Sequence, residues 1–184
     1  QLTDSELKVL SATEMSNDAK QLIESSSLLN IRKGICYYRD VIVNDDLYNI
    51  LSKVSKTSNI TKFADRLLKN PDSNIIANLY GFICHNDITI DKNGYIIAYK
   101  AVTSDFKDFY THTFDNSVGN IVVEDRKLMD SSSATCAKGL HVGSQSYISK
   151  IYGHDFTLLK CRVDPQDFVA IPADYNFAKA RVCK

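Results

Sequence analysis

The sequence has 184 residues, of which 44% are hydrophobic and 24% are charged, a composition typical of a folded globular protein. Its 22 Lys and Arg side chains balance 22 Asp and Glu side chains, so the formal net charge at pH 7 is +0. No excess of positive charge is available to hold a nucleic-acid backbone, and we therefore predict no direct nucleic-acid partner. Near-zero net charge weakens repulsion between molecules, which favours binding to a partner protein or self-association.

The cysteines are odd in number and widely spaced, without a C-x-x-C pair: Cys36, Cys84, Cys136, Cys161 and Cys183. This pattern argues against a disulfide framework. No apolar run approaches the roughly 20 residues of a membrane span, and the first residues lack the pattern of a secretory signal. We therefore expect a protein of the cell interior.

Residues 1–30 are predicted to form a helical arm, separate from a domain at residues 31–184. Thr3 and Glu6 have the spacing of a capping box at the start of a first helix, and Ser16 begins a second helical run. The arm contains few apolar residues. After Gly34 the pattern changes to two short strands, 35–38 and 41–43, around a tight turn.

Three helices follow, each after a residue suited to cap a helix N-terminus: Asn44, Asn59 and Ser73. Apolar residues recur at helical spacing in all three segments. Pro71 separates the last two helices, because proline cannot donate a hydrogen bond within a helix and restricts the residue before it.

Beyond residue 86 the apolar spacing becomes typical of strands. Residues 88–90 and 95–99 flank Asn93-Gly94, a pair that tolerates the positive φ angles of a hairpin turn. A short helix is expected at 144–152. Two long loops, 103–117 and 127–137, are of the kind that often carries function. Further strands are predicted at four places: 120–123, 140–142, 157–163 and 168–171. The fold class is therefore α+β, with N-terminal helices followed by a mostly antiparallel sheet.

The segment 139–147 is the most unusual in the chain, because a strand bracketed by glycines leads into a Ser-capped helix. Gly139 and Gly143 allow a ligand to approach the backbone, and the helix that begins after Ser144 offers N–H groups to an anion. His141 alternates with apolar neighbours and so points away from their face, toward a cleft or solvent. The alternative is that His141 is an ordinary sheet residue and that Ser144 only caps the helix.

The sequence gives less support for metal binding or for catalysis. The Cys and His residues lack the closely spaced ligand pairs of structural zinc sites, so we predict no metal. Cys136 and a histidine could in principle form a nucleophilic pair, but no catalytic motif accompanies them. We predict no catalytic residue and no cofactor, and the balance of motifs is against an enzyme. The basic residues Lys179, Arg181 and Lys184 are expected to form a solvated terminus.

Four ordered groups of residues resemble the rIIB family of T-even-like bacteriophages. They are DITIDKNGYIIAYK at 87–100, TFDNSVG at 113–119, TCAKGLHVGSQSYI at 135–148, and a closing set within 164–183. The closing set contains Asp-Pro, Ile-Pro, Asp-Tyr-Asn and AKARVC in that order. The order and spacing match from about residue 33 to the C-terminus, whereas the resemblance fades over residues 1–30.

The resemblance implies an early phage accessory protein that acts by association with an rIIA-like phage protein. That pair would counter prophage exclusion or host defence and early lysis. The resemblance brings no catalytic residue with it. It implies a place in the host cytoplasm, peripheral at the inner membrane only through a partner, because the sequence has neither a span nor a strongly amphipathic basic helix.

A second, local resemblance suggests an alternative function. The segment from Gly139 to Tyr147 is similar to the poly-ADP-ribosyltransferase pattern, in which a G-[IL]-Y-F strand precedes a Ser-containing helix that helps to hold NAD. It implies NAD or nucleotide binding. The late glutamate of those enzymes is missing, since Glu124 is the only Glu after Glu24 and precedes the segment; Asp164 or Asp167, with shorter side chains, would have to substitute for it, so the fold can resemble that family while the chemistry is absent. The functional surface is predicted at 139–147 and the 103–117 loop. The candidate ligand-binding residues are Gly139, His141, Gly143, Ser144, Ser146, Tyr147, Lys100 and Tyr99.

Overall fold

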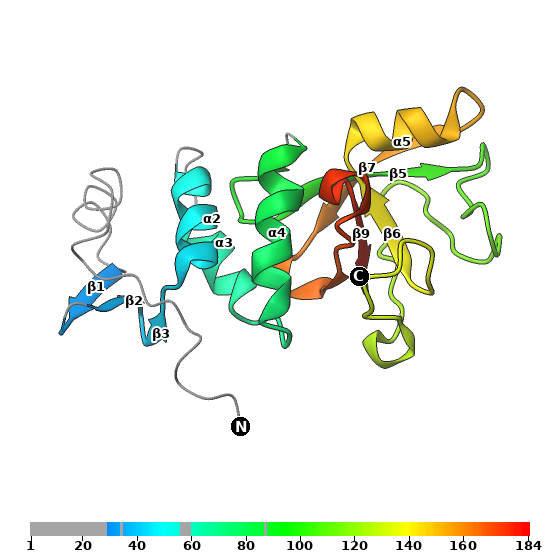
Figure 1. The fold of residues 1–184 in the computed structure, drawn as a ribbon. Coiled ribbons are helices and arrows are strands. Elements are labelled where there is room, and N and C mark those ends of the chain that lie inside the picture. The colour runs from blue at the N-terminus through cyan, green and yellow to red at the C-terminus, as the bar shows by residue number, and fades with distance from the viewer. Residues whose placement is uncertain (1–28, 34, 56–59, 87) are drawn as a thin grey trace.

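A computed structural model of the chain describes residues 29–33, 35–55, 60–86 and 88–184 (Figure 1). Along the chain, a small three-stranded sheet comes first, a group of helices follows, and a larger sheet completes the fold. The helices lie between the two sheets in Figure 1. The predicted α+β class with a mostly antiparallel sheet is confirmed.

The small sheet contains both predicted strands and one that was not predicted. Its antiparallel strands are β1 (Leu29–Arg32), β2 (Ile35–Tyr38) and β3 (Val41–Ile42). The prediction that the helical arm continues to residue 30 is wrong, because Leu29 and Asn30 begin β1 and pair with Tyr38 and Tyr37. Pairing with another segment overrides the local preference of the chain here. Residues 1–28 of the predicted arm lie outside the described residues.

The three predicted helices are present. They are α2 (Asp45–Ser55), α3 (Ile60–Leu67) and α4 (Asn74–His85). Asn44 caps α2, since its Oδ1 accepts a hydrogen bond from the backbone N–H of Leu47 at 2.9 Å. Ser73 does not cap α4 with its side chain, because it already has helical φ and ψ angles; Asp72 instead accepts a hydrogen bond from the N–H of Asn74. The predicted cap Asn59 lies outside the described residues.

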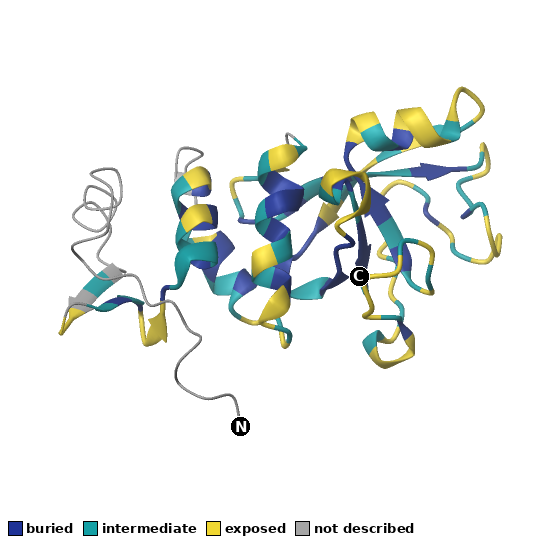
Figure 2. Ribbon diagram, in the orientation of Figure 1, coloured by how far each residue is buried: buried dark blue, intermediate teal, exposed yellow. Residues whose placement is uncertain are grey.

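The helices and the large sheet share one hydrophobic core (Figure 2). In α4, residues at helical spacing such as Ile75, Leu79 and Phe82 are buried, as is Phe63 of α3. The ring of Phe82 packs edge-to-face on Phe168 of the sheet, with 5.7 Å between centroids. Among the helices of the described ranges, none combines the length and apolarity that crossing a membrane requires.

In the large sheet, β5 pairs with three other strands. The strands of this sheet are β4 (Thr89–Ile90), β5 (Ile96–Val102), β6 (Leu140–Gly143), β7 (Thr157–Val163), β8 (Phe168–Ala170) and β9 (Lys179–Val182). All the pairings are antiparallel. β7 pairs with the full length of β5, whereas β6 pairs with β5 only at Tyr99, opposite Gly143. The ladder between β5 and β6 therefore ends just before Lys100.

The predicted hairpin at 88–99 is confirmed by the pairing of β4 with β5. Asp91 Oδ1 accepts hydrogen bonds from the backbone N–H groups of Asn93 and Tyr95, which closes the turn. Gly94 has φ +81°, and a Cβ atom there would lie 2.5 Å from the backbone nitrogen of Phe63. Glycine therefore serves both the turn and the close approach of α3.

Most of the remaining predictions for the C-terminal half also agree with the structure. Strands β6, β7 and β8 and helix α5 (Gln145–Tyr152) lie where expected, and 103–117 is a long loop. The predicted strand 120–123 is wrong, because that segment has no ladder partner; its end is tied to the sheet by a hydrogen bond from Glu124 N–H to Cys183 O. Strand β9 was not predicted. Short 3-10 turns occupy Arg126–Leu128, Pro165–Asp167 and Asp174–Phe177.

Candidate functional site

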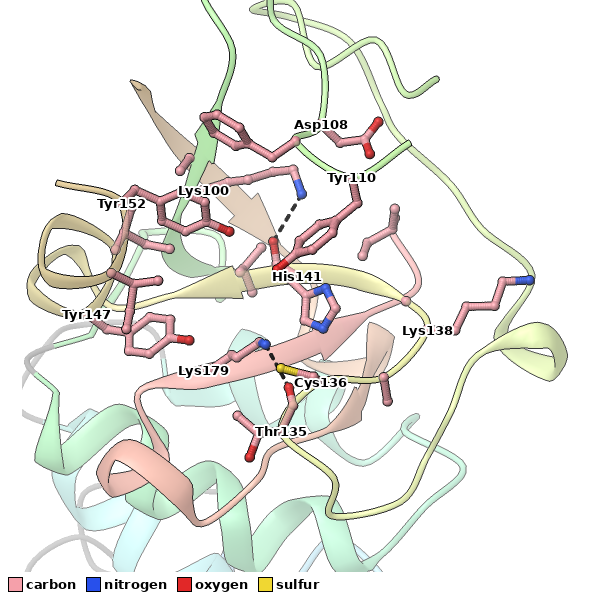
Figure 3. Close-up of a pocket in the computed structure, with 18 of the residues that line it drawn as sticks. Lys100, Asp108, Tyr110, Thr135, Cys136, Lys138, His141, Tyr147, Tyr152 and Lys179 are labelled. Carbon is pink, nitrogen blue, oxygen red and sulfur yellow. Dashed lines mark hydrogen bonds between the residues drawn. The ribbon is translucent and has the colours of Figure 1, made fainter. Parts of the chain in front are cut away.

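A pocket of about 560 Å³ lies beside the point where the β5–β6 ladder ends (Figure 3). Its walls come from the end of β5, the loop around residues 108–114, the segment 135–142, helix α5 and the start of β9. Both parts of the predicted functional surface, 139–147 and the 103–117 loop, therefore contribute to one concave site. Its volume is in the range of small-molecule sites.

The eight candidate residues divide into two groups of four. Gly139, His141, Tyr147 and Lys100 line the pocket. Not among the lining residues are Tyr99, Gly143, Ser144 and Ser146. Successive side chains alternate across a strand, so Tyr99 and Lys100 point to opposite sides of β5. That any of the eight binds a ligand stays a prediction.

Gly143 and Ser144 have structural roles beneath the pocket. A Cβ atom on Gly143 would lie 2.8 Å from the carbonyl oxygen of Ala178. This glycine therefore allows the backbone at Ala178, and not a ligand, to lie close to it. The Ser144 N–H donates to the same carbonyl at 2.9 Å, and Ser144 Oγ accepts a hydrogen bond from the N–H of Tyr147 at 3.2 Å. Ser144 thus caps α5, as predicted.

His141 lies on the floor of the pocket, partly buried. Burial, and to a lesser extent the positive charges of Lys179, Lys100 and Arg181, together lower the pKa of its imidazole to about 3. The ring is therefore neutral at pH 7. Its Nε2 atom is buried and has no hydrogen-bond partner among the described residues. Such a group can donate or accept one further hydrogen bond, depending on the tautomer.

Two lysines lie on either side of His141 in Figure 3. Lys100 comes from β5 and Lys179 from β9, the two strands that flank β6. Lys100 Nζ donates to the backbone oxygen of His141 at 3.2 Å, and Lys179 Nζ donates to that of Thr135 at 2.7 Å. Burial lowers the pKa of both ammonium groups. In the described part of the chain, no carboxylate forms an ion pair with either lysine.

Arg181 anchors one wall of the pocket from behind. The side chain is fully buried, and its guanidinium donates to the backbone oxygens of Asp130, Ser132 and Ala134. It thereby holds the 130–134 loop, which leads into the pocket wall. The expectation of a solvated basic terminus is wrong for this residue. The alternation of Lys179 and Arg181 with Ala180 and Val182 is the strand pattern that would have indicated β9.

Aromatic side chains form another wall of the pocket. Phe109 and Tyr152 have ring centroids 5.1 Å apart, and Tyr147 and Tyr175 have centroids 5.3 Å apart. Burial raises the pKa of Tyr147 to about 12, so its hydroxyl stays protonated at neutral pH. Of these four residues only Tyr147 was a predicted site residue, because the rings come from segments that meet only in the folded chain.

The acidic side chains at the pocket already have partners. Asp108 accepts hydrogen bonds from the backbone N–H groups of Thr111, Thr113 and Phe114 and from the Thr111 hydroxyl. Burial by itself would raise the pKa of Asp108, but these bonds hold it well below its usual range. Glu124 pairs with Lys138 at 3.5 Å. Within the described ranges, no group of three or more His, Cys, Asp or Glu side chains is placed to hold a metal ion.

Comparison with known proteins identifies the family. The family model described as bacteriophage T4 protein rIIB matches residues 6–184. The chain is 34% identical to protein rIIB of Enterobacteria phage T4 over 185 aligned positions, which cover 90% of this chain and 59% of that protein. The chain thus spans less than two thirds of that relative. No solved structure matches it. The resemblance found in the ordered motifs is confirmed, and the chain belongs to the rIIB family of bacteriophage proteins.

Proposed function

We propose that this chain is a phage accessory protein that acts by binding an rIIA-like phage protein, and that the pair counters prophage exclusion or host defence and early lysis. Membership in the rIIB family supports this proposal. The proposal places the protein in the host cytoplasm and brings it to the inner membrane only through its partner.

The observation that carries the proposal is a set of exposed apolar side chains on the segment 118–128. Val118, Ile121, Val123 and Leu128 are 85%, 73%, 60% and 60% exposed. Burial of such side chains at an interface is favourable, and the net charge of +0 adds no general repulsion between partners. We propose this segment as the contact surface for the rIIA-like protein.

The segment is held in place on the domain. Val122 packs against the core, whereas its neighbours Ile121 and Val123 face solvent. The next residue, Glu124, is bonded through its N–H to the carbonyl oxygen of Cys183. Little ordering of the backbone is then needed on binding, which reduces the entropic cost of association.

Co-purification of the chain with the rIIA-like protein of the same phage tests this proposal. We expect a complex at micromolar concentrations, measured by analytical ultracentrifugation. The variant Val118→Ser/Ile121→Ser/Val123→Ser should weaken it by about a hundredfold or more, because each buried apolar side chain contributes roughly 1.5–3 kcal/mol. In infection, a phage carrying this variant should plate less efficiently on a host with an excluding prophage than on a host without one.

Strand β3 provides the matched control. Val41→Ser/Ile42→Ser also replaces exposed apolar side chains, 42% and 41% exposed, in the separate three-stranded sheet. This variant should bind like the wild type, and both variants should unfold at a similar temperature. Absence of a complex, self-association alone, or equal weakening by both variants would contradict the proposal.

The poly-ADP-ribosyltransferase resemblance implies a different function, the binding of NAD or a nucleotide. It implies that Tyr99 or Lys100, together with His141, lines a cleft; Lys100 and His141 line the pocket, and Tyr99 does not. Because no glutamate follows the motif to stabilise a developing positive charge, we propose no transferase reaction.

A further inference from the structure

The pocket contains two lysines that form no ion pair within the described residues, although the negative charge of Asp108 acts on Lys100. Lys100 and Lys179 each donate to one backbone carbonyl, although a lysine ammonium has three N–H donors. Both groups are partly removed from water, and their depressed pKa values show that burial makes the charged form costly. An anion placed between them would offset that cost.

The carboxylates of the pocket do not supply this anion. Asp108 is occupied by four hydrogen bonds within its own loop, and Glu124 is paired with Lys138. The lining includes three lysines and two carboxylates, an excess of one positive charge, and the buried Arg181 adds another directly behind the wall. The electrostatic environment therefore favours a negatively charged ligand.

The other wall favours a planar ring. Phe109, Tyr147 and Tyr152 line the pocket, and their rings come from the 103–117 loop and from α5. Flat aromatic faces bind nucleic-acid bases by stacking, largely without regard to the identity of the base. Between the two walls, the neutral His141 presents a polar Nε2 atom with no partner among the described residues.

We propose that this pocket is a binding site for a free nucleotide, with its phosphate between Lys100 and Lys179 and its base against the aromatic wall. Phe109, Tyr147 and Tyr152 form that wall. His141 Nε2 forms a hydrogen bond to the ligand at the centre of the site. The inference goes beyond partner binding and does not depend on it, because the four exposed apolar side chains of 118–128 do not line the pocket, to which that segment contributes only Glu124.

Calorimetry with matched probes tests this assignment on the full chain. The probes are AMP, GMP, CMP and UMP, the corresponding nucleosides, and inorganic phosphate. We expect at least one nucleotide to bind with a Kd below about 1 mM, and at least about tenfold more tightly than both its nucleoside and phosphate. The nucleoside lacks the anion and phosphate lacks the ring, so the comparison measures both parts of the proposed recognition.

Substitutions locate the site. Lys100→Met and Lys179→Met should each weaken nucleotide binding by about tenfold or more, since each removes a charged hydrogen bond to the phosphate. Lys150→Met is the control, because Lys150 is exposed on α5 and is not among the lining residues. Tyr147→Leu should weaken nucleotide binding without changing the affinity for phosphate. Thermal unfolding without ligand checks that all variants remain folded.

Three results would overturn the assignment. They are no nucleotide binding at millimolar concentration, phosphate bound as tightly as every nucleotide, or nucleotide binding that both lysine variants leave unchanged. A chain that binds a nucleotide but no rIIA-like protein would contradict only the proposed function. A chain that binds that partner but no nucleotide would contradict only the pocket assignment.

Discussion

The buried imidazole of His141 should make the protein less stable as the pH falls. Its pKa in the folded chain is about 3, compared with an ordinary value of 6.5 that applies to the unfolded chain. Between these two values, the unfolded state binds a proton at this residue and the folded state does not. Stability from this group is therefore fully present above pH 6.5 and is lost progressively as the pH falls toward 3.

The loss of stability depends on how far the pH lies below the pKa of the histidine in the unfolded chain. One pKa unit corresponds to about 1.36 kcal/mol, so lowering the pH from 7 to 5 should cost about 2 kcal/mol through His141 alone. The charges of Lys100, Lys179 and Arg181 contribute to this cost, because a protonated ring would stand among three cations.

Urea unfolding at pH 7 and pH 5 measures this loss. His141→Gln cannot take up the proton, so the free energy of unfolding of this variant should fall by about 2 kcal/mol less than that of the wild type between the two pH values. All other titrating groups are common to both proteins and cancel in the comparison. His154→Gln, at an exposed position, should behave like the wild type. The reasoning is refuted if wild type and His141→Gln lose equal stability.

Three further substitutions test the packing that supports the pocket, each measured by urea unfolding. Phe63→Ala should cost about 3–5 kcal/mol, because this fully buried ring would leave a cavity; a loss below about 1 kcal/mol would contradict the shared core. Gly94→Ala should cost more than about 1 kcal/mol, since alanine is strained at φ +81° and its Cβ would meet the α3 backbone; an unchanged midpoint would contradict this. Arg181→Met should cost roughly 3 kcal/mol, because the carbonyl groups of the 130–134 loop lose their hydrogen-bond donors, and it should speed amide hydrogen exchange in that loop. The control Lys160→Met, at an exposed position, should change stability by less than about 0.5 kcal/mol.

Much of the fold could be predicted because local chemistry determines it. The Asn93-Gly94 pair predicts the hairpin, and the structure has Gly94 at the positive φ that the turn requires. Asn44 predicts the start of α2 because a side-chain oxygen there can accept an N–H of the first turn. The spacing of apolar residues predicts β7 and α5, because that spacing is a property of each segment by itself.

The errors fall where a segment takes its structure from a distant partner. β1 was missed because its pairing with β2 defines it. β9 was missed although its residues alternate, because the basic residues near the C-terminus predicted a solvated end, whereas β6 and β8 pair on both sides of this segment. The segment 120–123 has strand-like residues but no strand beside it, and so forms no ladder. Backbone pairing depends on what the fold brings alongside, which local preference does not specify.

The same distinction applies to the pocket. The sequence alone drew attention to the glycine-bracketed strand and its histidine, because glycine spacing and strand alternation are local properties. Only the tertiary structure brought Lys179 and Phe109 into one pocket beside that strand and buried Arg181 behind it. Burial, charge and concavity arise from contacts between segments far apart in the chain. They therefore became visible only once the antiparallel sheet had put β5, β6 and β9 side by side.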